Sequence, residues 1–393
     1  MMWRREPQLK HRPRVERAAP SLQPNQGWSK AAPMPLAPRS ADHIITVAQH
    51  LRGGGVERAM LRLARGWLAM GRRVTLVAGS LEGPLAAELP AGLDLVELGA
   101  PSVRPLFALP RLVEERRPDL IFCPGNFYTA VAAWTRLRLG RGAPPIVGKL
   151  SNATDRGDHG RIAGAAHRLW LAEHGRFLDQ VVAMTPATAR AAERALRMPG
   201  RVSVIPNPPA IPLADAMQPP LPTGRFILGV GRLAPQKRWD RLIAALPQLA
   251  DRNVSLAILG EGELRHDLQA QVRALALEGR VTMPGHAGDP LGAMARAAVL
   301  ALTSDFEGVP GVLREALSVG TPVVATDSSP SVAEIIASPD FGTTVRRDDR
   351  AALVEALNHW LSPGMPRPRP VPQPGADAPA RYLALFDQLV SQA

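Results

Sequence analysis

Two glutamates eight positions apart, Glu307 and Glu315, are the side chains in this sequence that most clearly suggest chemistry. The apolar run 299–302 before them predicts a buried strand, and residues 311–319 predict a helix with Glu315 inside its apolar stripe. A carboxylate in that place is costly unless hydrogen-bond donors surround it. Glu307 precedes the helix start, where backbone N–H groups lack partners. This arrangement at the end of a parallel strand favours an anionic, hydroxyl-rich ligand such as a sugar nucleotide.

The same pattern has a structural alternative. Glu315 could form a salt bridge within an ordinary α/β protein, and Glu307 could be solvated. Both interpretations stay open on these residues alone.

A pair of cations follows another predicted strand, residues 226–230. Arg232 and Lys237 are five positions apart and flank a predicted helix start. Two positive charges with unpaired N–H groups could bracket a diphosphate. Surface cations around a helix start are the alternative.

A glycine-rich turn, residues 53–55, links the predicted strand 43–48 to a helix. Glycines let a ligand approach backbone N–H groups at a helix start. The turn matches neither a Walker loop nor the dinucleotide fingerprint, and a tight turn without a ligand has the same composition.

Three segments together resemble a known family. Residues 304–327 read Ser, then Glu-Gly-x-Pro, a second glutamate, and Ala-Leu-x-x-Gly-Thr-Pro-Val-Val-Ala-Thr-Asp. This order resembles the donor-site signature of retaining glycosyltransferases of family 4 (glycosyl transferases group 1), which have the GT-B fold. The segment 231–237 resembles the family's Gly-Arg-Leu-x-x-x-Lys motif, and 54–58 resembles its Gly-Gly-x-Glu-Arg loop.

The resemblance implies roles for individual residues. Glu307 would contact the donor sugar, Glu315 would hold the ribose, and Arg232 with Lys237 would clamp the diphosphate; these are the expected catalytic and donor residues. Other expected donor contacts are Gly308, Val309, Gly311, Val312, Gly260, Gly262, Met283 and Gly285.

On the acceptor side, the resemblance implies a phosphate-facing loop at Gly53, Gly54 and Gly55. Many family members carry a histidine near the acceptor where this chain has Asn126, so Asn126 is the expected polar substitute. Lys149 ends the next predicted strand and is expected either in a domain-interface salt bridge or at the ligand.

The 393-residue length predicts two domains, and alternating strands and helices make both α/β. We expect a disordered basic tail at 1–40, an acceptor-side Rossmann-like domain at 41–210 and a linker at 211–223. Next we expect a nucleotide-sugar-binding Rossmann-like domain at 224–365. The chain then ends in a proline-rich segment with a terminal helix at 366–393. In GT-B proteins that helix crosses back to the first domain.

The net charge of +12 comes partly from the tail, where residues 1–40 hold eight Lys/Arg and two acids. Such a tail is either solvated or held on an anionic membrane. Nucleic acid is a weaker alternative, since no recognition motif accompanies the charge. Residues 161–177 mix cations with a tryptophan, which predicts a core helix with a solvated face or, alternatively, a helix on a lipid surface. The single Cys123 excludes an intramolecular disulfide, and no run of 18 apolar residues predicts a membrane span.

We therefore expect a cytoplasmic protein, either free or peripheral at the inner membrane face, that transfers a hexose-type sugar with retention. The donor is a nucleoside-diphosphate sugar, UDP- ahead of GDP-, and the acceptor is lipid-linked or a glycan in polysaccharide or lipopolysaccharide synthesis. No metal and no cofactor are expected, because no Asp-x-Asp motif is visible. The alternatives are a non-catalytic sugar-nucleotide-binding or scaffold protein and a sugar-nucleotide epimerase or hydrolase.

Overall fold

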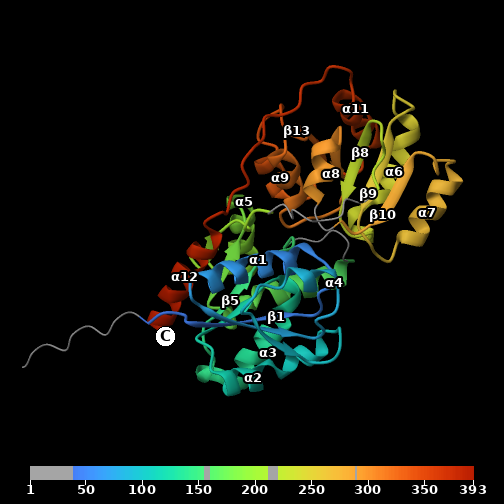
Figure 1. Cartoon of the computed structure of the whole chain (residues 1–393). Helices are drawn as coiled ribbons and strands as arrows, with labels where there is room; N and C mark the ends of the chain where they lie inside the picture. The colour runs from blue at the N-terminus through green and yellow to red at the C-terminus, as the bar shows by residue number, and fades with distance from the viewer. Residues whose placement is uncertain (1–38, 155–159, 211–219, 288–289) are drawn as a thin grey trace, which may run out of the picture. The chain divides into compact units, whose positions relative to one another are not determined.

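The computed structural model describes residues 39–154, 160–210, 220–287 and 290–393. The expected tail therefore lies outside the described residues except for 39–40, and so does most of the expected linker, 211–219. Within the described residues the strands form two parallel sheets with helices packed on their faces (Figure 1).

The first sheet has the strand order β3-β2-β1-β4-β5-β6-β7. Its domain runs through β1 (His43–Ala48), α1 (Gly55–Ala69), β2 (Arg73–Ala78), β3 (Asp94–Glu97), α2 (Leu109–Arg116), β4 (Leu120–Cys123), α3 (Thr129–Leu139), β5 (Ile146–Lys149), α4 (Arg161–Ala172), β6 (Gln180–Ala183), α5 (Pro186–Leu196) and β7 (Val202–Val204).

The second sheet has the order β10-β9-β8-β11-β12-β13. It is built from β8 (Phe226–Val230), α6 (Trp239–Ala245), β9 (Ser255–Leu259), α7 (Arg265–Ala274), β10 (Val281–Gly285), α8 (Pro290–Arg296), β11 (Val299–Leu302), α9 (Gly311–Ser318), β12 (Val323–Thr326), α10 (Pro330–Ile335), β13 (Gly342–Val345) and α11 (Arg350–Trp360). α12 (Ala378–Gln392) follows at the C-terminus.

Both sheets are doubly wound, and in each the strand order reverses beside the first strand of the domain. β1 lies between β2 and β4, and β8 lies between β9 and β11. Ligands of such sheets collect outside the carboxyl ends of the strands at this reversal. The carboxyl ends of β8 and β11 therefore lie where doubly wound sheets usually bind ligands. Lys237 follows β8, and Glu307 follows β11.

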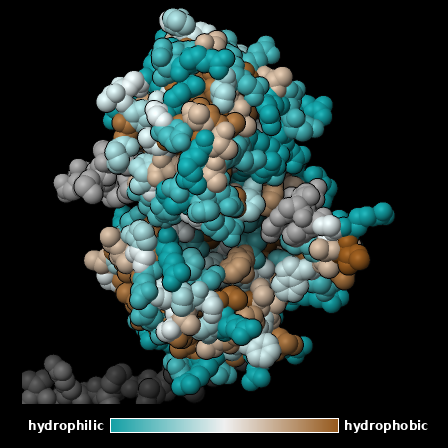
Figure 2. Space-filling model, turned by 90° about the vertical axis from the view of Figure 1, so that its right-hand side faces the viewer, coloured by the Kyte–Doolittle hydropathy of each residue, from teal (hydrophilic) through white to brown (hydrophobic). Residues whose placement is uncertain are grey.

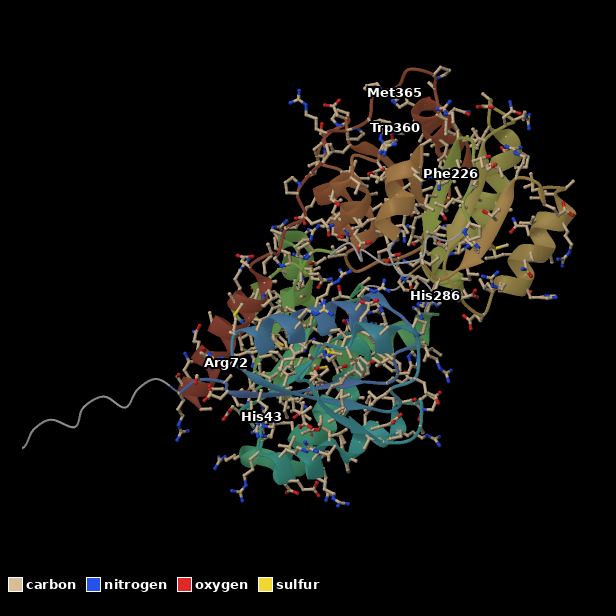
Figure 3. All side chains as sticks on the ribbon, in the orientation of Figure 1. His43, Arg72, Phe226, His286, Trp360 and Met365 are labelled. Atoms are coloured by element: carbon tan, nitrogen blue, oxygen red, sulfur yellow. The ribbon has the colours of Figure 1, made fainter. Side chains whose placement is uncertain are left out.

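Alternation along the strands divides the core of the first domain. Ile44 packs with α1 and α12 on one face of the sheet, whereas its neighbour Ile45 packs with residues of α2, α3 and α5 on the other. The second domain has one connected core that includes Phe226 and Trp360, both labelled in Figure 3.

The terminal helix α12 is part of the core of the first domain. Phe386 and Tyr382 of α12 pack against Trp67 of α1 and Phe122 of β4, with ring centroids 5.2 to 6.0 Å apart. A β-carbon on Gly66 would lie 2.5 Å from the Pro379 ring, so the glycine lets the two helices approach closely. The C-terminal segment thus completes a core that begins near the N-terminus.

No described helix is long and apolar enough to cross a bilayer.

The fold predicts that Phe386→Ala destabilises the first domain by about 3–5 kcal/mol, because Phe386 is fully buried in the aromatic cluster. Urea unfolding followed by tryptophan fluorescence measures this change. Phe107→Ala is the control, since Phe107 is 38% exposed. Equal losses in the two variants would show that α12 contributes no more than a surface aromatic.

Candidate functional site

An ion pair joins the two segments that the sequence singled out. Lys237 Nζ lies 2.6 Å from Glu307 Oε1, and the Ser304 hydroxyl donates to the same oxygen at 2.6 Å. Both charged side chains are largely buried, with 15% and 10% of their surfaces exposed. The tertiary structure therefore brings the expected clamp cation and the expected sugar-contacting carboxylate into direct contact.

Backbone contacts fix the two loops that carry this pair. The amide of Asp305 donates to the carbonyl of Gln236 at 2.9 Å, and the Gln236 side chain donates to the carbonyl of Phe306 at 2.7 Å. The Thr303 hydroxyl lies 3.1 Å from the Lys237 carbonyl. The loops after β8 and β11 thus form one rigid unit.

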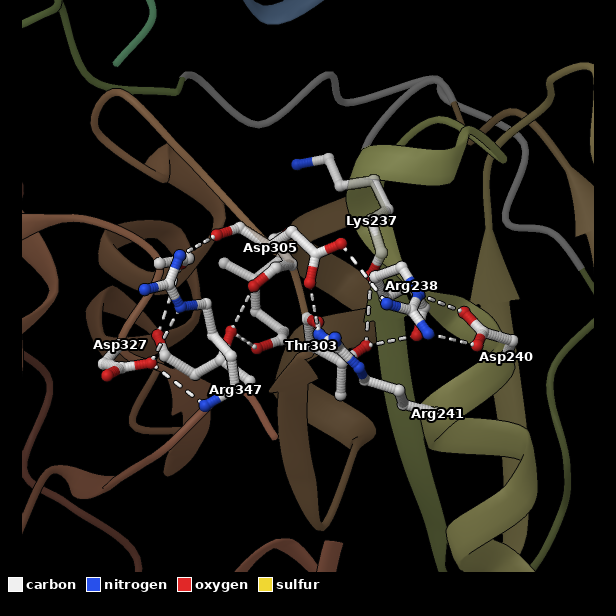
Figure 4. A network of polar contacts seen from close by, with 12 residues as sticks. Lys237, Arg238, Asp240, Arg241, Thr303, Asp305, Asp327 and Arg347 are labelled. Carbon is white, nitrogen blue, oxygen red and sulfur yellow. Dashed lines mark hydrogen bonds and ion pairs between the residues drawn. The ribbon is translucent and has the colours of Figure 1, made fainter. Parts of the chain in front are cut away.

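A network of charged side chains around Asp305 contacts the same loops (Figure 4). Asp305 accepts from Arg241 at 2.6 Å and from Arg238 at 3.3 Å, whereas Lys237 points away from this group. Hydrogen bonds from Arg238 to Asp240 raise the pKa of that guanidinium further above its usual value. Arg347 donates to the Asp305 carbonyl at 2.9 Å, so the network fixes the backbone beside Glu307.

A cavity of about 450 Å³ opens beside this network. Four arginines and three aspartates contribute to its wall, and each of these arginines is within 4.0 Å of an aspartate. Its lining is Arg238, Arg241, Asp305, Phe306, Asp327, Arg346, Arg347 and Asp348. Lys237, Glu307 and Glu315 are not among these lining residues, so the cavity does not include the ion pair.

Glu315 lies at the edge of the buried face of α9. Leu313, Ala316 and Leu317 are the buried residues of that helix, while Glu315 is half-buried. The structure places Arg62 of α1 4.0 Å from Glu315. Burial lowers the pKa of Arg62, and the carboxylate opposes that change. The helix begins at Gly311, where the sequence predicts its start, with Pro310 as its cap, and Val312 is half-buried in its first turn.

Gly308 is the point where the loop after β11 meets the first domain. A β-carbon on Gly308 would lie 2.3 Å from the carbonyl oxygen of Ser151. The hydroxyls of Ser329 and Ser331 donate to the Gly308 carbonyl at 2.5 and 3.0 Å. Val309 follows, half-buried against the second core. The loop can therefore approach Ser151 only because residue 308 has no side chain.

The glycines after β9 hold neighbouring loops together. β-carbons on Gly260 and Gly262 would lie 2.0 and 2.4 Å from the carbonyls of Gly231 and Leu233. These glycines therefore set the position of the loop that carries Arg232 and Lys237.

The end of β10 joins the same cluster. Arg265 donates to the carbonyl of Met283 at 2.9 Å and pairs with Glu261 at 2.5 Å. A β-carbon on Gly285 would lie 3.0 Å from the Glu261 carboxylate. Met283 and Gly285 thus lie beside Glu261 in the loop after β9.

Arg232 is exposed, and its side chain makes no hydrogen bond or ion pair with the part of the chain that the structure describes. Its carbonyl accepts from the Trp239 indole at 2.9 Å. The Lys237 side chain passes over Gly231, where a β-carbon would meet it at 3.1 Å. Both cations therefore extend from the loop after β8, and of the two only Lys237 pairs with a carboxylate among the described residues.

The glycine turn of the first domain faces the second. A β-carbon on Gly53, which has φ 115°, would lie 3.3 Å from the ring of His286, labelled in Figure 3. Gly54 has φ 153° and lies against the Glu57 carboxylate, and Gly55 begins α1. The turn and the end of β10 therefore lie side by side.

Lys149 is buried at the end of β5. Only 3% of its surface is exposed, and it makes no hydrogen bond or ion pair with any described residue. Burial lowers its pKa to about 8, and the charge of Glu57 limits the decrease. Glu57 in turn accepts from the Tyr128 hydroxyl at 2.8 Å. The expected salt bridge at Lys149 is therefore wrong for the described residues.

Asn126 has a structural task. Its side-chain oxygen accepts from the amides of Ser151 and Asn152 at 2.8 and 3.2 Å. Asn126 thus positions the loop that contacts Gly308.

The sequence interpretation missed Arg62, which comes from a distant segment without a local signal. Ser304 begins the motif, and Ser151 and His286 follow the expected site residues Lys149 and Gly285, but the sequence did not show which side chains they contact. Among the described residues, no group of three or more His, Cys, Asp or Glu lies close enough to hold a metal ion.

Two facing Rossmann-like domains with a shared terminal helix define the GT-B class, and similarity to solved structures agrees. HepE from Anabaena, solved with UDP-glucose, matches at a TM-score of 0.64 and 19% identity over 89% of this chain and 97% of that one. Residues 53–208 match Glycosyltransferase Family 4, and residues 216–370 match Glycosyl transferases group 1. The chain therefore belongs to the glycosyltransferases that these two family models describe, one model for each half of the chain.

Curated relatives match over parts of their length. A diphospho-undecaprenol 4-alpha-N-acetylgalactosaminyltransferase of Campylobacter jejuni is 36% identical over 137 residues, 35% of this chain and 37% of that protein. This chain thus spans about a third of that relative. The lipopolysaccharide 1,6-galactosyltransferase of Escherichia coli is 27% identical over 65% of this chain and 69% of that protein.

We predict that Gly308→Ala disrupts the site while Gly311→Ala is tolerated. The added methyl group at 308 would overlap the Ser151 carbonyl, whereas nothing lies within 4 Å of the position it would take at 311. Overpacking against backbone costs about 1–3 kcal/mol. Thermal unfolding of both variants checks this, and equal melting temperatures would show that the loop does not depend on the contact.

Lys149→Met should stabilise the fold at pH 7 by on the order of 3 kcal/mol, because a pKa reduced from 10.5 to about 8 measures the cost of the buried charge. Below about pH 8 the cost is fully present. Between pH 8 and 10.5 the unfolded chain binds more protons, so native stability rises with pH and the advantage of the variant disappears. Urea titrations at pH 7 and pH 10 check this. A pH-independent difference would contradict it.

Proposed function

We propose that this protein is a retaining glycosyltransferase that moves a hexose-type sugar from a nucleoside-diphosphate sugar, UDP- ahead of GDP-, to a lipid-linked or glycan acceptor. The product would belong to polysaccharide or glycolipid synthesis. The observation that carries the proposal is the Lys237–Glu307 pair at the strand-order reversal of the second sheet.

In this proposal, the positive charges of Arg232 and Lys237 bind the donor diphosphate and speed the transfer step. When the nucleoside diphosphate leaves, negative charge grows on its phosphate oxygens, so nearby cations stabilise the transition state more than the ground state. Arg232 is exposed for this contact, and Lys237 can exchange part of its interaction with Glu307 for phosphate. The start of α9 has no side-chain cap, so its first N–H groups suit the same anion.

The carboxylates have separate tasks in this proposal. Glu307 accepts hydrogen bonds from the donor sugar while Lys237 and Ser304 hold its other oxygen, Oε1. Glu315 accepts from the ribose hydroxyls, and Arg62 lies 4.0 Å from it at the edge of α9. Retention requires no protein nucleophile if the departing phosphate receives the acceptor proton.

The direct test is nuclear magnetic resonance of the purified protein with a panel of UDP- and GDP-sugars and a polyprenyl-linked acceptor. A new glycoside with the donor's anomeric configuration supports the proposal. An epimer or free sugar alone supports an epimerase or hydrolase, and no turnover with saturable binding supports a sugar-nucleotide-binding or scaffold protein. Because protein cations take the place of a metal here, transfer should persist in excess EDTA, and a strict need for added divalent ion would contradict that part.

The ion pair also predicts opposite effects on nucleotide binding. Lys237→Ala removes a charge-assisted contact and should weaken nucleoside-diphosphate binding by roughly 10- to 100-fold. Glu307→Ala removes the carboxylate that competes for Lys237, so nucleotide affinity should stay equal or rise while kcat falls. Calorimetry with the nucleoside diphosphate and steady-state rates measure the two quantities. A loss of nucleotide affinity in Glu307→Ala would reverse the assignment.

Glu315→Gln keeps the shape of the side chain and removes its charge, so it should raise the donor KM with a smaller change in kcat. Arg62→Gln is the matched control, because it breaks the same ion pair while leaving the carboxylate. If Arg62→Gln raises KM equally, the effect comes from the pairing between α1 and α9 rather than from a ribose contact.

A further inference from the structure

Helix α4 presents its apolar side to solvent. Leu171 is the one buried residue of its 12, whereas Ile162 is 88% exposed and Leu169 is 66% exposed. Ile162, Ala165, Ala166 and Leu169 follow the spacing of a single helix side, opposite Leu171. Residues 161–177 therefore reach the core through Leu171 and Phe177, as the core-helix expectation requires, but the exposed side of α4 carries apolar side chains.

Specific contacts hold α4 in this orientation. The ring of Trp170 stacks on Phe177 at 5.5 Å between centroids, and the His174 ring bonds to the Trp170 carbonyl at 2.9 Å. Leu171 packs into the core of the first domain. Trp170 still keeps 37% of its surface exposed, so one edge of the indole remains at the boundary of the apolar stripe.

The charged side chains of α4 itself are positive. Arg161 and Arg168 are exposed and seven residues apart, so they lie on one flank of the helix. α4 contains no Asp or Glu, and Glu173 just after it pairs with Arg176 at 2.6 Å. Figure 2 views the side on which Figure 1 places α4, where hydrophobic residues are exposed among hydrophilic ones.

We propose that the outward stripe of α4, residues Ile162, Ala165, Ala166, Leu169 and Trp170 with Arg161 and Arg168 beside it, docks the protein on an anionic lipid bilayer. Large apolar side chains and a tryptophan edge enter the headgroup boundary, and flanking arginines meet lipid phosphates. The inference does not depend on the sugar or on turnover, because lipid binding is measured without a donor.

A bilayer fits this surface better than a protein partner. The helix is roughly 18 Å long, and its exposed apolar side carries two large aliphatic residues separated by alanines. A stable protein interface needs about 800 Å² on each side with a packed centre, which one such stripe does not supply. Shallow insertion into lipid requires no shape complementarity.

The experiment is vesicle flotation of the full chain with phosphatidylcholine vesicles containing about 30% phosphatidylglycerol, and with phosphatidylcholine alone. The native protein should float with the anionic vesicles. Ile162→Ser/Leu169→Ser should reduce the bound fraction about tenfold, and Arg161→Gln/Arg168→Gln should weaken binding to the anionic vesicles selectively. Both double variants change exposed residues, and circular dichroism with thermal unfolding verifies their fold.

The matched control is Met70→Ser/Leu275→Ser, which removes two exposed hydrophobic side chains outside α4. It should float like the native chain. Brominated lipids provide a second measurement, since they should quench native tryptophan fluorescence more than that of Trp170→Phe.

Several outcomes would overturn the proposal. The native chain could fail to float, or the Ile162/Leu169 variant could float as well as the native chain, which would place binding elsewhere, the basic N-terminal segment included. Loss of a native dimer in that variant, seen by analytical ultracentrifugation without any change in flotation, would identify the stripe as a contact between copies.

Discussion

The buried ion pair between Lys237 and Glu307 is the interaction on which the second domain's functional end depends. It joins the loops of two adjacent strands at the point where strand order reverses, and Ser304 completes the coordination of Glu307 Oε1. A buried charge pair is stable only when its geometry is fixed. The Asp305 network behind it supplies that rigidity through Arg238, Arg241 and the Arg347 contact with the backbone.

Backbone proximity is the second constraint, and it explains why glycines gather in these loops. Gly260 and Gly262 approach the backbone of the loop after β8, and Gly308 approaches Ser151 of the first domain. A methyl group in any of these places would overlap a carbonyl oxygen. The loops that carry Arg232, Lys237 and Glu307 are therefore positioned by close main-chain contacts as well as by the charged side chains of the Asp305 network.

In the first domain, a buried charge lowers the stability of the fold. Lys149 is buried without a hydrogen-bond or ion-pair partner among the described residues, and Glu57, whose charge acts on its pKa, accepts a hydrogen bond from Tyr128. Such a charge lowers stability, so the fold tolerates it only because the aromatic cluster around Trp67 and α12 stabilises the same domain. An unpaired buried cation at a strand end is typical of a position that meets an anion.

The sequence by itself determined the α/β class, the strands and the motif residues, because hydrophobic periodicity and glycine–proline signals are local. It located Glu307 and Lys237 separately but did not show that they pair. Only the tertiary structure placed Arg62 beside Glu315 and His286 beside Gly53, since these contacts join segments far apart in the chain. It also decided the orientation of α4: periodicity shows that a helix has an apolar side, but what that side faces depends on the neighbours the fold provides.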